Sequence, residues 1–284
     1  MTISERIPLA IRASKVPEVS VLFWVIKVLT TGTGETTSDF FVKAFDPVPV
    51  VLIAAVVFVA CLVIQLRAPR YIAWRYWLLV AMVGVFGTMV ADVTHIVVGV
   101  PYEYSTAAFA IILAAVFVTW WLVERTLSIH SIVTRRRELF YWATVISTFA
   151  LGTAAGDLTA TSLHLGYLGS GILFAVAIAV PGIAYAISRR GAVLFFWIAY
   201  VLTRPLGASF ADWLGVDHSR GGLAIGTAAV SLVGAAAVAA LVAVLAARTK
   251  RNSAQPEKSP SRAFYREMDD SSPTPLPDVA PDGS

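Results

Sequence analysis

The chain has 284 residues, of which 57% are hydrophobic and only 14% are charged. Soluble domains carry about 25% charged residues, so this composition excludes an ordinary water-soluble fold. The single cysteine, Cys61, excludes a disulfide framework, and the net charge of +4 comes from basic residues beside apolar stretches, which is not the pattern of a nucleic-acid-binding protein.

Eight apolar stretches are long enough to cross about 30 Å of hydrocarbon as helices that rise 1.5 Å per residue. The first contains Lys27 and no small-residue cleavage site follows it, so we expect a retained helix and not a signal peptide. Residues 249–284 are rich in Ser, Pro, Asp and Glu, which predicts a disordered tail. The predicted spans are residues 18–40, 49–66, 75–97, 105–123, 139–160, 167–187, 192–214 and 222–247.

Basic residues predict the orientation of these spans. Arginines follow the second, fourth, sixth and eighth spans, whereas the alternate loops hold only Lys43 and Arg220. Loops that are rich in Lys and Arg stay in the cytoplasm. The sequence therefore predicts an all-α polytopic protein of a bacterial inner membrane, with eight transmembrane helices and both termini cytoplasmic.

Four of the eight tryptophans begin a repeated pattern, in which an aromatic residue precedes the tryptophan, a glycine follows ten residues later, and an aspartate follows fifteen residues later. The four sets are Trp24, Gly34 and Asp39; Trp77, Gly87 and Asp92; Trp142, Gly152 and Asp157; and Trp197, Gly207 and Asp212. This spacing predicts four two-helix repeats, which all have the same orientation because each contains an even number of spans. The predicted division is a cytoplasmic N-terminus at 1–17, repeats at 18–70, 71–130, 131–190 and 191–248, and the tail at 249–284.

The pattern resembles a family of bacterial membrane-anchored proteins with four tandem two-helix repeats, known as domain of unknown function 347. The segments GETTSD (34–39) and TRPLGASFAD (203–212) are typical of it. The resemblance covers roughly residues 17–247 and implies the same topology, but the family has no established activity to carry over.

The repeated aspartates are the first candidates for function. Asp39 shares a helical stripe with Glu35, and the other repeats have the same phase; Thr88 and Thr153 stand where the first repeat has Glu35. Intramembrane carboxylates are costly unless they face a cavity or a partner. Converging carboxylates would bind hard cations such as Mn²⁺, Mg²⁺ or Ca²⁺, take up protons, or pair with basic groups. Alternatively, each aspartate only ties its helix end to the outer loop.

Two basic residues lie well inside predicted spans, at different positions of their repeats. Lys27 follows its tryptophan by three residues, and Arg204 follows its tryptophan by seven, next to Pro205. They could gate the carboxylates, act as permanent counter-ions, or form an anion site. Arg204 is expected to pair with Asp212 or with an aspartate of another repeat.

The remaining candidates are weaker. His95 follows Asp92 by one helical turn, so these two side chains are a possible metal or proton-relay pair. The repeated glycines are expected to let helices approach closely, and the tryptophans are expected to pack in the interior or to anchor the helices at the interface.

These features favour a secondary transporter, most readily of a divalent metal or a proton-coupled cation. The alternative is a non-transporting membrane scaffold or sensor with a disordered tail. The sequence has no nucleotide loop and no metalloprotease motif, so we expect neither an enzyme nor a bound cofactor; the expected partners are the lipid bilayer and a cation, not nucleic acid.

Overall fold

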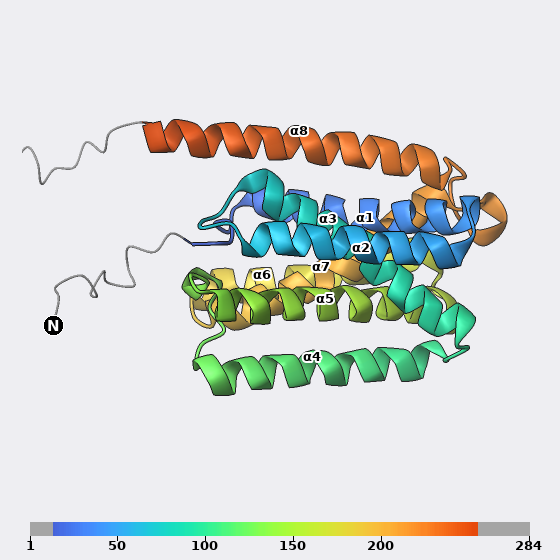
Figure 1. Cartoon of the computed structure of the whole chain (residues 1–284). Coiled ribbons are helices and arrows are strands. Elements are labelled where there is room, and N and C mark those ends of the chain that lie inside the picture. The colour runs from blue at the N-terminus through green and yellow to red at the C-terminus, as the bar shows by residue number, and fades with distance from the viewer. Residues whose placement is uncertain (1–13, 255–284) are drawn as a thin grey trace, which may run out of the picture. The chain divides into compact units, whose positions relative to one another are not determined.

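The computed structural model describes residues 14–254, and all regular secondary structure in this range is helical. The eight long helices coincide with the eight predicted stretches. They are α1 (Val21–Ala44), α2 (Pro47–Leu66), α3 (Ala73–Asp92), α4 (Tyr102–Glu124), α5 (Arg135–Asp157), α6 (Gly166–Ser188), α7 (Ala192–Gly215) and α8 (Thr227–Ala254) (Figure 1).

Both predicted terminal segments are only partly described. The helix α8 continues to Ala254, so residues 249–254 of the predicted tail are helical and not disordered. The rest of that tail, and residues 1–13 of the predicted N-terminus, lie outside the described residues. The described residues up to Ala246 belong to one compact unit, and the following paragraphs concern this unit.

Seven of the described helices, α2 to α8, are long and apolar enough to cross a membrane. The helix α1 is less apolar because its middle and second half are rich in threonine and glycine and contain Glu35 and Asp39. Helices α2, α4 and α6 have only 11–22% of their apolar windows buried, whereas α3, α5 and α7 have 50–61% buried. Long apolar helices with this much exposed surface indicate a membrane protein.

The odd-numbered helices form the centre of the unit. The helix α1 packs against α3 and α7, and α5 packs against the same two, so the four helices make a closed ring, which we call the inner ring. Each of α2, α4 and α6 packs mainly on the odd helix of the next repeat. The helix α8 continues this order onto α1, where Ser231 Oγ donates a hydrogen bond to Thr36 Oγ1 at 2.9 Å. The tandem repeats therefore close on themselves.

The repeated glycines make the same contact at all four interfaces of the inner ring. Counted from the tryptophan of its repeat, each glycine is at position 10, and it lies against position 7 of the next repeat around the ring. Because glycine has no side chain, the helices approach closely there. The pairs are Gly34 with Gly84, Gly87 with Phe149, Gly152 with Arg204, and Gly207 with Thr31.

Candidate functional site

A buried guanidinium lies inside the inner ring. Arg204 belongs to position 7 of α7 and is completely buried. Its Nη2 forms an ion pair with Glu35 and donates hydrogen bonds to Thr88 Oγ1 and, at 2.8 Å, to Thr153 Oγ1. Its Nη1 donates to the carbonyl oxygen of Thr31 at 3.1 Å. One arginine thus bonds to side chains of α1, α3 and α5 at once.

The three side-chain partners of Arg204 occupy one position of the repeat. Glu35, Thr88 and Thr153 are all at position 11, and the fourth repeat has Ala208 there. The guanidinium therefore fills the space where a fourth polar side chain would otherwise face the other three. We call this group, Arg204 with Glu35, Thr88 and Thr153, the arginine layer.

The partner of Arg204 is not the predicted one. The sequence was expected to pair Arg204 with an aspartate such as Asp212, whereas the structure pairs it with Glu35. Asp212 is eight residues along the same helix, about 12 Å in rise, which is too far for the guanidinium to bond. Glu35 is buried on the adjacent helix α1, which Gly207 allows to lie against α7.

Lys27 lies next to the arginine layer and has no carboxylate partner. Its side chain is fully buried, and its Nζ has no hydrogen-bond partner among the described residues. The Nζ lies 4.2 Å from the ring centroid of Phe149 and 4.4 Å from that of Tyr200. Cation–π contacts are the attraction available to an ammonium in this position.

Polar groups continue to one end of the inner ring. We call it the arginine-rich end, because the arginines that follow α2, α4 and α6 lie there. The hydroxyls of Tyr76 and Tyr141 are hydrogen-bonded to each other between α3 and α5. Farther toward this end, Lys15 Nζ lies 2.6 Å from Glu138 Oε2, and Gln65 Nε2 donates to Glu138 Oε1 at 2.9 Å. All three of these last side chains are buried, so the segment before α1 covers this end of the ring.

Sequence reasoning missed this second buried ion pair. The available signal was Glu138, a single acidic residue directly after three arginines at the start of α5. Lys15 is far away in sequence, and its backbone N–H is held by the carbonyl oxygen of Ile132 at 3.0 Å. Beside this cluster, burial raises the pKa of Tyr71 to about 12, so its hydroxyl keeps its proton at neutral pH.

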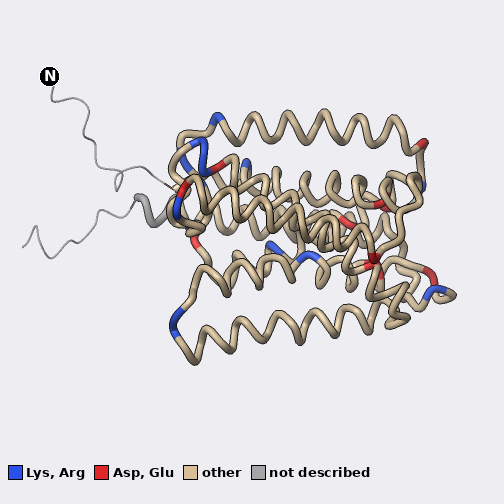
Figure 2. Tube along the Cα trace, turned by 90° about the horizontal axis from the view of Figure 1, so that it is seen from below, with Lys and Arg blue, Asp and Glu red and all other residues tan. Residues whose placement is uncertain are grey.

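The four aspartates lie at the opposite end of the inner ring, where Figure 2 shows acidic segments gathered away from most of the basic ones. Asp212 is buried, and Asp92 and Asp157 are partly buried. Asp39 is partly buried too and pairs at 2.5 Å with the exposed Lys43.

This acidic end does not form a closed metal cage. Among residues 14–254, no three His, Cys, Asp or Glu side chains are close enough to hold a metal ion. His95 Nε2 is hydrogen-bonded to Ser105 Oγ at 2.6 Å, and its Nδ1 is 3.9 Å from Asp157. The carboxylate nearest to His95 is thus on another repeat, and not the predicted Asp92.

Two of the repeats change their helical geometry directly after the aspartate. α3 passes into the π-helical turn Val93–Val97 after Asp92, and α5 passes into Leu158–Ser162 after Asp157. The helices α1 and α7 continue as α-helix past their aspartates. Such π-turns occur frequently at functional sites. At the acidic end, the second and third repeats therefore differ from the first and fourth, because only the former have a π-helical turn after the aspartate.

The tryptophans are packing residues of the arginine-rich half. Trp77, Trp142 and Trp197 are buried, and Trp24 is partly buried. The indole N–H of Trp197 donates to the carbonyl oxygen of Leu127 at 2.9 Å, which fixes the loop after α4 against α7. Of the two predicted roles, the structure favours packing in the interior.

Comparison with protein families identifies the repeat. A family model described as Repeat of Unknown Function (DUF347) matches the chain four times in succession, at residues 22–71, 75–126, 140–191 and 195–251. The chain belongs to this family. The four matches agree with the four tandem repeats predicted from the tryptophans. No curated protein and no solved structure shows significant similarity to the chain.

Proposed function

We propose that this member of the DUF347 family is a secondary transporter of a cation, with eight spans in a bacterial inner membrane and a pathway through the inner ring. The observation that carries the proposal is a row of buried polar and charged groups along the ring, which we call the polar file. The polar file runs from the aspartates through the arginine layer and Lys27 to the Tyr76–Tyr141 pair. Buried charges in a membrane are expensive and mark ion pathways more often than packing.

The acidic end is the proposed entrance. Four aspartates at one end of the ring attract and concentrate cations. A cation that enters reaches Glu35, the deepest carboxylate, and competes there with Arg204. When the cation is bound to Glu35, the Nη2 of Arg204 keeps its hydrogen bonds to Thr88 and Thr153, which stabilise the guanidinium without its carboxylate partner. Arg204 is then a gate, and Lys27, which lies against the same Phe149 ring, is a second gating residue.

A non-transporting scaffold is the second candidate, and the closure of the ring favours it. Arg204 is hydrogen-bonded to residues of α1, α3 and α5, and Lys15 and Glu138 cover the arginine-rich end of the ring. A transporter has this arrangement only in its closed state, whereas a scaffold keeps it permanently.

Flux measurements on reconstituted protein separate the two candidates. We expect liposomes that contain the wild-type protein to take up Mn²⁺ or to exchange it for protons, as read by an internal metal- or pH-sensitive dye. Glu35→Gln should abolish the flux, and so should Asp157→Asn. The matched control is Glu103→Gln, because Glu103 is an exposed carboxylate at the start of α4. Wild-type protein that moves neither ion, or equal flux in E35Q and E103Q, would refute the transporter and leave the scaffold.

A further inference from the structure

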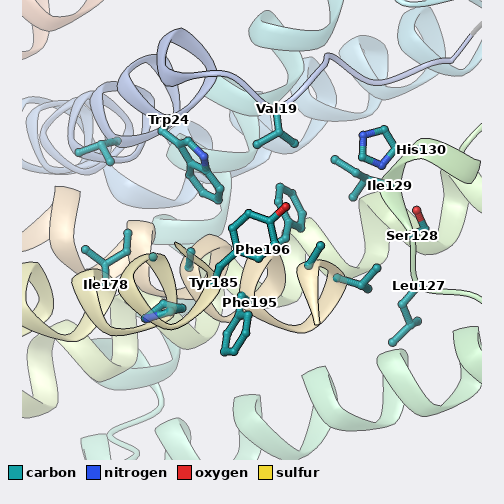
Figure 3. Close-up of a pocket in the computed structure, with 16 residues that line it drawn as sticks. Val19, Trp24, Leu127, Ser128, Ile129, His130, Ile178, Tyr185, Phe195 and Phe196 are labelled. Atoms are coloured by element: carbon teal, nitrogen blue, oxygen red, sulfur yellow. The ribbon is translucent and has the colours of Figure 1, made fainter. Parts of the chain in front are cut away.

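A large apolar pocket lies outside the inner ring, at the arginine-rich end. Its volume is about 570 Å³, within the range of roughly 300–1,000 Å³ that is typical of small-ligand sites. Figure 3 shows Val19 and Trp24 of the first repeat on one side, Ile178 and Tyr185 of α6 on the other, and the loop 127–130 at one end. None of its lining residues belongs to the polar file, so the proposed pathway does not use this pocket.

The floor and walls of the pocket are suited to a hydrocarbon chain. Phe196 and Trp24 lie in contact, with ring centroids 5.5 Å apart, and both line the pocket. Pro181 and Gly182 of α6 also line it, and the position of Gly182 is open, because a Cβ added there would meet no heavy atom within 4 Å. The pocket offers few polar groups, which does not suit a charged or sugar-like ligand.

Exposed arginines flank the pocket in the sequence. Arg189 and Arg190 are exposed in the turn that joins α6 to α7, between the lining residues Tyr185 and Ala192. Arg125 is exposed too, two residues before Leu127 on the loop that closes one end. Basic groups at the membrane surface attract anionic lipid headgroups. An apolar pocket below several arginines fits a molecule with a hydrocarbon tail and an anionic head.

We propose that this pocket binds one anionic phospholipid of the surrounding bilayer, with an acyl chain against Trp24 and Phe196 and the phosphate near Arg189 and Arg190. The site is independent of transport and rests only on the protein lying in a membrane. The lipid would fill the space between α1 and the α6–α7 pair, and so support the contact that brings Glu35 to Arg204.

Native mass spectrometry of the full-length protein in detergent tests this site. The probes are phosphatidylglycerol and phosphatidylcholine with the same acyl chains. Because each arginine at the membrane surface contributes about 1 kcal/mol to the attraction, Arg189 and Arg190 together should make the first phosphatidylglycerol bind on the order of thirtyfold more tightly than the first phosphatidylcholine. The double substitution Arg189→Gln/Arg190→Gln should bring the two affinities together.

A pocket-filling variant locates the lipid. Gly182→Leu adds a bulky side chain at a lining position of the pocket and should weaken the binding of both lipids at least tenfold. Ala186→Leu adds similar bulk to an exposed part of α6 that does not line the pocket, and should leave binding unchanged. Equal affinities of the wild-type protein for the two lipids would overturn the proposal, as would wild-type binding in G182L or an equal loss in A186L.

Discussion

Breaking the arginine layer should destabilise the protein, and restoring charge balance should rescue it. Arg204 is completely buried, and Glu35 is 4% exposed. Glu35→Gln leaves the guanidinium buried without a counter-charge, which costs about 3–5 kcal/mol in the free energy of unfolding. Arg204→Met removes the cation, while Glu35 keeps the hydrogen bond from Thr88 and can take up a proton, so its cost should be smaller, about 1–3 kcal/mol.

The double variant Glu35→Gln/Arg204→Met distinguishes an ion pair from two separate effects. With both charges gone, the remaining amide, hydroxyls and thioether are all neutral, and replacing a buried ion pair by neutral groups of similar volume is often nearly neutral in stability. We expect the double variant to be close to the wild type in stability and much less destabilised than E35Q alone, so that the effects of the two single substitutions are strongly non-additive. Equilibrium unfolding in mixed micelles measures the free energy of unfolding of the wild type, the two single variants and the double variant. Additive effects of the two substitutions would show that the pair contributes nothing.

Four other substitutions or labels have direct outcomes. Asp92→Asn should abolish flux and leave the unfolding free energy unchanged, since Arg204 does not depend on this carboxylate; early melting would assign it a structural role. Gly34→Ala should cost about 1–3 kcal/mol, because its Cβ would lie 2.8 Å from the backbone of α3, whereas Gly182→Ala should cost nothing. Lys27→Met should raise stability, because it removes an ammonium without an acceptor, and a large loss in thermal unfolding would contradict this. Cysteines placed at 131–136 should react with a membrane-impermeant maleimide only from the cytoplasmic side, and labelling from the periplasm would invert the proposed topology.

Much of the architecture could be predicted because repeats copy their contacts. The spacing of tryptophan, glycine and aspartate predicts that position 10 of each odd helix is a close contact between helices. Gly34 and Gly207 both lie against a neighbouring odd helix at this position. The lengths of the apolar stretches predicted the eight helices to within a few residues, except that α8 extends to Ala254. The periodicity of the sequence therefore predicts correctly the helices of each repeat and the position of its close glycine contact.

The partners of individual charges could not be predicted in the same way. Periodicity places Arg204 and Glu35 on inward-facing positions, but the distance between them depends on how four helices are staggered around the ring. The pairing of Lys15 with Glu138 depends on a segment that is not part of any repeat. His95 was assigned to Asp92 because they are one turn apart, yet the crossing of α3 and α5 brings Asp157 nearer to it.

The closed order of the inner ring explains why four units share one polypeptide. Four separate copies of a single two-helix unit could build the same ring, because each interface repeats the glycine contact. Such a homotetramer would carry the same residue at every position 7, and four guanidiniums would meet and repel one another at the axis. Joining the copies in one chain lets a single arginine face one glutamate and two threonines. Joining the repeats in one chain thus allows one arginine, paired with one glutamate, where a symmetric assembly would place four arginines.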